Sequence, residues 1–372
     1  MTHIAGDHGT PQFSVGQSLQ WELRLLLLDR RSVLLGALTS LAASHLARSA
    51  PRHWLTPDRI TNFLLPELQT VALDGADGVT FVRDGPANAP LILYFHGWGD
   101  DYHMVMPLEF GLAEAGFRLL LPHRPGYVGT ALSGTRGSES VSWQGPAGTA
   151  DLMARLLDKL YGPSKWDVAV VSMSGGTPAA LAFASRYPAQ TRALVLQAGV
   201  THAFSDAKYV PEALRGEYTT AFKSFGWTGD QVSQIIFALL VKLRDTFMTD
   251  EETLHAVTGE RLADAKQDVA FEAVVERVLR DDPGNRNGEW SDVRQTLFST
   301  SPYCDWDSIR APTLIIHDAM DPFVPVLHAR EAKAHLPQAT LRTFSLGGHI
   351  IWLGREALLM HQARVDFLKR HS

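Results

Sequence analysis

The chain has 372 residues, of which 45% are hydrophobic and 20% charged, a composition that predicts a large buried core and excludes disordered, collagen-like and multi-span membrane proteins. The formal net charge is -6, from 34 basic and 40 acidic residues without a long block of like charge, so we expect no nucleic-acid partner. The single cysteine, Cys304, excludes an internal disulfide framework and a zinc site built from cysteines.

Residues 1–66 differ in character from the rest of the chain. Within them, residues 21–47 hold two apolar runs separated by Asp29-Arg30-Arg31, and neither run reaches the roughly 20 residues that a bilayer span requires. We interpret residues 1–66 as a helical extension whose segment 21–47 packs on the domain or on a partner, or lies on a membrane surface. Two alternatives stay open: a tilted span, and a twin-arginine export signal ending near Ala47-Arg48-Ser49-Ala50. We predict a cytoplasmic location, with membrane association and export as the alternatives.

Beyond residue 66, short apolar runs alternate with longer helical patterns. Strands are expected at residues 91–95, 118–121, 167–171, 192–196, 313–316 and 339–345, and helices at about 103–116, 146–161, 178–187 and the C-terminus. Apolar strands that alternate with helices form a parallel sheet covered on both faces. We therefore predict an α/β core made of residues 67–200 and 311–372.

Residues 201–310 interrupt this alternation. They show helical periodicity and dense charge, for example over Gln231–Leu243 and Phe271–Arg280, and no convincing strand. An insertion of this length is large enough to cover the carboxyl ends of the strands, so we predict a helical lid. The apolar run Ile235–Leu243 is compatible with a substrate pocket and equally with the core of the lid itself.

The strongest chemical signal is a serine that directly follows an apolar strand, in the run Val170-Val171-Ser172-Met173-Ser174-Gly175-Gly176-Thr177-Pro178. A nucleophile on a sharp strand-to-helix turn has a strained backbone, and the residues two before and two after it must be small. Around Ser174 these residues are Ser172 and Gly176. Around Ser172 the first of them would be Val170, which is β-branched and fits poorly. We therefore predict Ser174 as the nucleophile, although the pattern is S-x-S-x-G in place of G-x-S-x-G.

Several motifs resemble those of the α/β-hydrolase superfamily, in the chain order of that family. Residues 96–99 (H-G-W-G) resemble its oxyanion loop. Residues 123–128 (H-R-P-G-Y-V) resemble the D-R-P-G-Y-G loop of one branch, with His123 in place of Asp and Val128 in place of the second Gly. Ser174–Pro178 resembles the S-G-G-G-P run of the same branch, Asp321–Pro325 the D-x-x-V-P turn that carries the acid, and Gly347-Gly348-His349 the loop that bears the base. The resemblance covers about residues 78–199 and 311–372. It implies an α/β-hydrolase fold, with a mostly parallel central sheet, helices on both faces and an inserted lid.

The resemblance implies a catalytic triad of Ser174, His349 and Asp321, with the backbone N–H groups of Trp98 and Gly175 as the oxyanion hole. The chemistry of these groups is consistent with that reading. A serine hydroxyl needs a base, histidine accepts and returns a proton near neutrality, and a carboxylate on its other ring nitrogen fixes the tautomer. We expect a serine hydrolase that acts on a small-molecule acyl substrate, most simply a carboxylic ester, without a cofactor or a metal.

Other functions share this set of residues. Amide, thioester or carbon–carbon bond hydrolysis, acyl transfer, and a non-catalytic binding role on the same scaffold stay open. The sequence does not identify the substrate or the oligomeric state.

Some neighbouring residues have two interpretations. Asp318 is an alternative acid to Asp321, while we expect His317 to end a strand and His96 to brace the oxyanion loop. Asp100, Asp101 and His103 resemble a metal cluster by composition only, and we interpret them as a solvated helix start, where acidic residues are favourable.

Overall fold

A computed structural model describes residues 55–73, 76–136, 139–204, 206–210, 250–280, 283–299 and 302–372, all of which lie in one compact unit, Pro51–Ser372. The predictions for residues 21–47 and for Ile235–Leu243 fall outside the described residues. Within the described ranges, no helix combines the length and the apolar composition that crossing a membrane would require.

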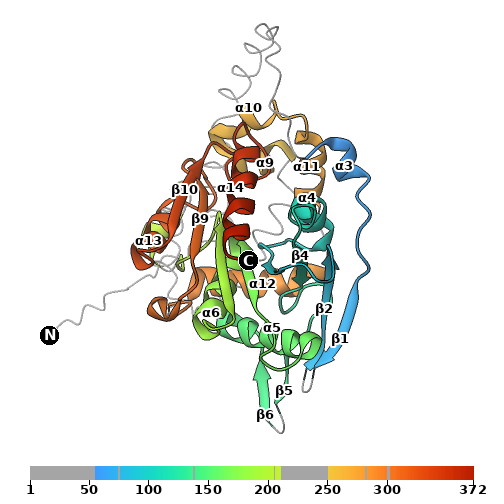
Figure 1. Ribbon diagram of the computed structural model, residues 1–372. Coiled ribbons are helices and arrows are strands. Elements are labelled where there is room, and N and C mark those ends of the chain that lie inside the picture. The colour runs from blue at the N-terminus through green and yellow to red at the C-terminus, as the bar shows by residue number, and fades with distance from the viewer. Residues whose placement is uncertain are drawn as a thin grey trace, which may run out of the picture. The chain divides into compact units, whose positions relative to one another are not determined.

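A ten-stranded sheet runs through this unit (Figure 1). The strand order is β10-β9-β8-β7-β3-β4-β2-β5-β6, and β1 pairs with β2. The strands from β10 to β4 are parallel to one another, whereas β1, β2, β5 and β6 pair antiparallel. The bounds are β1 (Gln69–Leu73), β2 (Ala76–Asp84), β3 (Leu91–Phe95), β4 (Arg118–Pro122), β5 (Ser133–Arg136), β6 (Glu139–Ser142), β7 (Val168–Met173), β8 (Thr191–Gln197), β9 (Thr313–Asp318) and β10 (Thr340–Phe344).

The helices lie between these strands along the chain. Their bounds are α3 (Pro57–Thr61), α4 (Tyr102–Glu114), α5 (Gly145–Tyr161), α6 (Thr177–Arg186), α9 (Asp250–Thr258), α10 (Leu262–Ala265), α11 (Phe271–Val278), α12 (Arg286–Phe298), α13 (Leu327–His335) and α14 (Ala357–Arg370).

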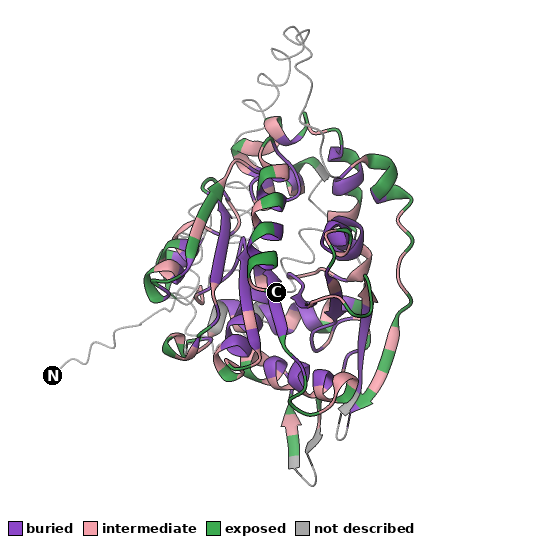
Figure 2. Cartoon of the chain, in the orientation of Figure 1, coloured by how far each residue is buried: buried purple, intermediate pink, exposed green. Residues whose placement is uncertain are grey.

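Two apolar clusters cover the opposite faces of the sheet, because alternate residues of a strand point to opposite faces. In β3, Ile92 and Tyr94 pack with α4 and α14, whereas Leu93 and Phe95 pack with α5 and α6. Every residue of β3 and β7 is buried, and Figure 2 shows the central strands in purple. This double coverage explains why the central strands are continuous apolar runs in the sequence. The predicted mostly parallel sheet with helices on both faces is confirmed.

The antiparallel strands β1, β2, β5 and β6 were not predicted. In β1, exposed and partly buried residues alternate, and only the last residue is buried. A strand that is partly in contact with solvent lacks the continuous apolar run on which the prediction of the central strands rested.

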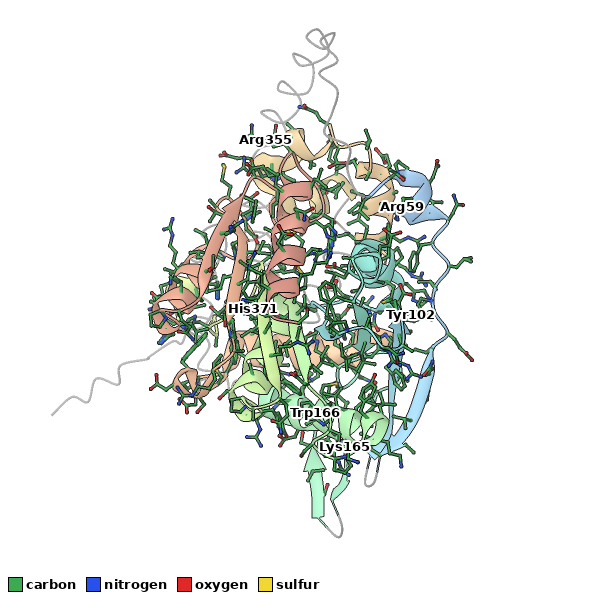
Figure 3. All side chains as sticks on the ribbon, in the orientation of Figure 1. Arg59, Tyr102, Lys165, Trp166, Arg355 and His371 are labelled. Carbon is green, nitrogen blue, oxygen red and sulfur yellow. The ribbon has the colours of Figure 1, made fainter. Side chains whose placement is uncertain are left out.

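Part of the predicted N-terminal extension belongs to the compact unit. Leu55 and Ile60 are fully buried, and Arg59 of α3, labelled in Figure 3, donates a hydrogen bond to Glu114 of α4. The described part of residues 201–310 contains α9, α10, α11 and α12 and no strand. Its role as a lid stays a prediction.

Candidate active site

Ser174 occupies a sharp turn between β7 and α6. The strand ends at Met173, and Ser174 has a φ of +47°, in the left-handed region that non-glycine residues rarely adopt. A Cβ on Gly176 would lie 2.4 Å from the carbonyl oxygens of both Phe95 and His96, so no larger residue fits there. The structure therefore contains the strain and the crowding that the sequence pattern predicted.

Ser172, two residues before this turn, is buried in the core. Its Oγ lies 3.0 Å from Thr177 Oγ1, and both residues are fully buried. The residue that departs from the usual pattern is therefore engaged in a buried hydroxyl pair at the start of α6.

A continuous hydrogen-bonded chain joins Ser174, His349 and Asp321. His349 Nε2 is 2.8 Å from Ser174 Oγ, and His349 Nδ1 is 2.8 Å from Asp321 Oδ2. Asp321 Oδ1 accepts hydrogen bonds of 2.9 Å from two backbone N–H groups, at Phe323 and Val324. Burial alone would raise the pKa of Asp321, but His349 and these hydrogen bonds outweigh it and lower the pKa below the ordinary value. The carboxylate is therefore ionised at neutral pH.

The loop that carries His349 contacts the insertion. Gly348 has a φ of +67°, and a Cβ on it would lie 2.7 Å from the carbonyl oxygen of Thr258. The His349 N–H donates to the carbonyl oxygen of Val257 at 2.8 Å. The position of His349 thus depends on α9 as well as on the core.

Asp318 has other partners, and His317 lies beside the Asp321 carboxylate, with 3.6 Å between His317 Nε2 and Asp321 Oδ2. Asp318 forms an ion pair with Arg261, with 3.2 Å between Nε and Oδ2, and accepts a hydrogen bond from the Leu346 N–H at 2.8 Å. His317 lies in β9, as expected, and its Nε2–H donates to the carbonyl oxygen of Val324 at 2.8 Å. The carboxylate that contacts His349 is therefore that of Asp321, and not that of the alternative, Asp318.

The backbones of the two predicted oxyanion donors are adjacent. A Cβ on Gly175 would lie 3.3 Å from Trp98 N. His96 braces this loop, as expected, because its Nδ1–H donates to the carbonyl oxygen of Gly97 and its Nε2 accepts from the Arg124 N–H, each at 3.0 Å. Burial lowers the pKa of His96 well below the ordinary value, so the ring stays neutral while it bridges the two loops.

Asp101 marks the start of α4, as expected, but it is not solvated, and the sequence-based interpretation was wrong on that point; Asp100 is partly exposed. Asp101 caps α4 by accepting a hydrogen bond of 2.7 Å from the His103 N–H, but it is buried. Asp100 Oδ2 accepts a hydrogen bond of 2.8 Å from the Gly97 N–H, and burial raises the pKa of this carboxyl to about 7. Across the described ranges, no group of three or more His, Cys, Asp or Glu side chains is arranged to hold a metal ion.

The two departures from the D-R-P-G-Y-G pattern have different consequences. His123 is buried, with Nδ1 3.0 Å from Thr80 Oγ1, and Tyr102, labelled in Figure 3, packs edge-on against it at 5.4 Å. Burial lowers the pKa of His123 to about 4, so it is neutral at pH 7. Val128 has a φ of +46°, a conformation that glycine adopts without strain and a β-branched residue does not.

Aromatic and apolar side chains flank the histidine. The Phe323 ring lies 5.1 Å from the His349 ring and 6.4 Å from the Trp98 ring. Val200, Tyr303 and Val324 form a small buried cluster against which Phe323 packs.

One polar residue of the site gave no signal in the sequence. Asp292 of α12 is buried and pairs with Arg124, 168 positions earlier in the chain. Neither spacing nor a motif links two residues so far apart, so only the fold reveals the pair.

Comparisons with known proteins identify the fold family. The model of the α/β hydrolase fold family matches residues 90–355. YcgS, an uncharacterized hydrolase of Bacillus subtilis (strain 168), is 27% identical over 305 residues, which cover 81% of this chain and 98% of that protein. An α/β hydrolase fold protein from Nakamurella multipartita has a TM-score of 0.56 at 23% identity, covering 81% of this chain and 98% of its own. The enol-lactonase from Burkholderia xenovorans LB400 has a TM-score of 0.55 at 16% identity, covering 81% and 100%.

Proposed function

This chain belongs to the α/β-hydrolase fold family, and we propose that it hydrolyses carboxylic esters with Ser174 as nucleophile, His349 as general base and acid, and Asp321 as the carboxylate that orients His349. The observation that carries the proposal is the unbroken series of 2.8 Å contacts from Ser174 Oγ through His349 to Asp321. This is the arrangement that converts a weak hydroxyl into a nucleophile at neutral pH.

The proposed reaction has two halves. Ser174 Oγ attacks the acyl carbon while His349 Nε2 takes its proton, and the resulting oxyanion accepts hydrogen bonds from the Trp98 and Gly175 N–H groups. His349 then gives the proton to the departing alcohol, which leaves an acyl-serine. In the second half His349 deprotonates water, which attacks the acyl carbon, and Ser174 is regenerated with its proton.

An ester with an apolar acyl group fits the surroundings of the nucleophile best. Trp98 and Phe323 offer aromatic surface beside His349, and the buried cluster of Val200, Tyr303 and Val324 continues it. The enol-lactonase with the same fold acts, by its name, on a cyclic ester. The acyl carbon of an ester is also more electrophilic than that of an amide, and an alkoxide leaves more readily than an amide anion, so ester hydrolysis has the lower intrinsic barrier.

Labelling with a fluorophosphonate tests the proposal, because this probe reacts with activated serines. We expect the wild-type chain to be labelled and Ser174→Ala not to be. Ester turnover in Ser174→Ala should fall by at least about 10⁴-fold. Ser172→Ala is the matched control: it should keep its labelling, while the loss of the bond to Thr177 lowers stability by about 1 kcal/mol.

A series of p-nitrophenyl esters of rising chain length then tests the apolar acyl group. We expect kcat/KM to rise with chain length before it levels off. A folded wild-type chain that neither reacts with the probe nor hydrolyses any ester would refute the proposal, as would labelling that persists in Ser174→Ala.

A further inference from the structure

The oxyanion loop is connected to α12 of the insertion by a buried ion pair. Arg124, in the loop after β4, donates from Nη1 to Asp292 Oδ1 and from Nη2 to Asp292 Oδ2, the latter at 2.7 Å. Arg124 and Asp292 are both at least 95% buried. This is a bidentate, charge-assisted contact, which fixes orientation as well as distance.

The guanidinium of Arg124 has a second acceptor. Its Nη2 also donates to the carbonyl oxygen of Gly97 at 2.8 Å. That carbonyl belongs to the peptide unit whose N–H is that of Trp98, the proposed oxyanion donor. Because a trans peptide is planar, with C=O and N–H pointing in opposite directions, a donor that holds the oxygen also sets the direction of the Trp98 N–H.

A second connection reaches the other side of Trp98. Tyr127 donates its hydroxyl proton to Asp292 Oδ2 at 2.5 Å, and the Tyr127 hydroxyl oxygen in turn accepts a hydrogen bond from the Gly99 N–H at 3.2 Å. Because the Tyr127 hydroxyl donates its proton to Asp292, it acts as the acceptor in its contact with the Gly99 N–H. The peptide units before and after Trp98 are thus both held by side chains that converge on Asp292.

The packing of α12 leaves little freedom in this contact. The Gly288 N–H donates to the carbonyl oxygen of Gly126 at 3.1 Å, and a Cβ on Gly288 would lie 2.0 Å from Tyr127 Cδ2. The helix therefore approaches the loop that holds Arg124 and Tyr127 as closely as a glycine permits (Figure 1 shows α12 in orange).

We propose that Asp292 is a positioning residue for the oxyanion hole: through Arg124 and Tyr127 it orients the peptide that carries the Trp98 N–H, so the insertion completes the site. This inference rests on the proposed function for its catalytic consequence. Removal of one oxyanion donor lowers kcat by roughly 10²–10³-fold. A donor that is present but misdirected retains part of its effect, and the expected loss is about 10- to 100-fold.

The decisive variant is Asp292→Asn in the full chain, which keeps the shape of the side chain but removes its charge and turns one acceptor into a donor that faces Arg124. We expect kcat for a neutral ester to fall about 10- to 100-fold while KM changes less than about threefold, because the oxyanion exists in the transition state and not in the bound ester.

A matched control separates this effect from general destabilisation. Glu109 pairs with Arg364 in an equally buried ion pair and also bonds Tyr94 and Trp352. Glu109→Gln should lower stability but keep kcat within about twofold of the wild type. If Glu109→Gln loses as much kcat as Asp292→Asn, or if Asp292→Asn keeps the wild-type kcat, the proposed role of Asp292 is wrong.

A spectroscopic measurement makes the test independent of turnover. The chain contains nine tryptophans, so ¹⁵N-tryptophan labelling gives a small set of backbone amide signals, and Trp98→Phe identifies that of Trp98. We expect this signal to shift in Asp292→Asn and to stay in place in Glu109→Gln. An unshifted Trp98 signal in Asp292→Asn would overturn the inference even if the proposed ester hydrolysis holds. A shifted signal in a chain that hydrolyses no ester would refute the proposed function and leave the positioning of this peptide supported.

Discussion

Asp100→Asn is expected to remove an alkaline decline from the pH–activity profile. Asp100 accepts a hydrogen bond from the Gly97 N–H near Ser174, the proposed nucleophile, and burial raises the pKa of its carboxyl to about 7. Arg124 and His349 act in the opposite direction, by favouring the ionised form. The side chain is therefore neutral at pH 6 and negatively charged at pH 9.

The size of the effect follows from the position of this charge. A Cβ on Gly97 would lie 2.3 Å from Asp100 Oδ2 and 3.4 Å from Ser174 Cβ, so the carboxylate lies within about 6 Å of Ser174 Cβ. Taking the same distance of about 6 Å for the oxyanion that would develop beside Ser174, the negative charge opposes it by about 3 kcal/mol at an effective dielectric constant of about 20. That energy corresponds to a rate factor of about 100. The positive charge that forms on His349 offsets part of it, and a decline of about 10- to 100-fold is expected.

The assay is kcat/KM for a neutral ester from pH 5.5 to 9.5 at constant ionic strength. The wild-type value should fall as the pH rises through about 7, whereas Asp100→Asn should show no such fall. Asp101→Asn, which changes the adjacent carboxylate that caps α4, should retain the wild-type decline. An alkaline decline of equal size in Asp100→Asn and in the wild type would refute this reasoning.

Three further substitutions test the local structure, each by urea unfolding. Gly176→Ala places a Cβ 2.4 Å from the carbonyl oxygens of Phe95 and His96, and should lower the free energy of unfolding by about 1–3 kcal/mol and reduce ester turnover; wild-type stability would contradict the steric argument. Val128→Gly relieves about 1–2 kcal/mol of left-handed strain against a glycine entropy of about 1 kcal/mol, so stability should stay equal or rise by up to about 1 kcal/mol, and a clear loss would be inconsistent with strain at this position. Burial lowers the pKa of His123 to about 4. Between about pH 6.5 and 4 the unfolded chain therefore binds a proton on this histidine that the native state does not bind, and the native state loses stability as the pH falls through this range. His123→Asn should therefore weaken the fall in stability between pH 6.5 and 5 by up to about 1.4 kcal/mol per pH unit; equal slopes would count against a buried neutral His123.

The central strands and the elbow could be predicted because their signals are local. β3 and β7 are buried on both faces, and they therefore appear in the sequence as unbroken apolar runs that end where the chain leaves the sheet. The small residues around Ser174 reflect contacts made within one turn of chain. The antiparallel strands β1, β2, β5 and β6 lack a continuous apolar run, and the burial of Asp101 depends on residues that pack over the start of α4 from elsewhere in the chain.

The sequence by itself therefore determined the fold class and Ser174 as the candidate nucleophile. Strand burial and the sterics of a sharp turn both depend on the types of residues that are close together in the chain. Only the tertiary structure decided which carboxylate contacts His349. Asp318 and Asp321 are three residues apart and equivalent in chemistry, and they differ only in the partners that the folded chain brings to them, Arg261 for one and His349 for the other. The connection from Asp292 to the oxyanion loop was decided in the same way, because an ion pair between residues 168 positions apart exists only once α12 packs against the loop after β4.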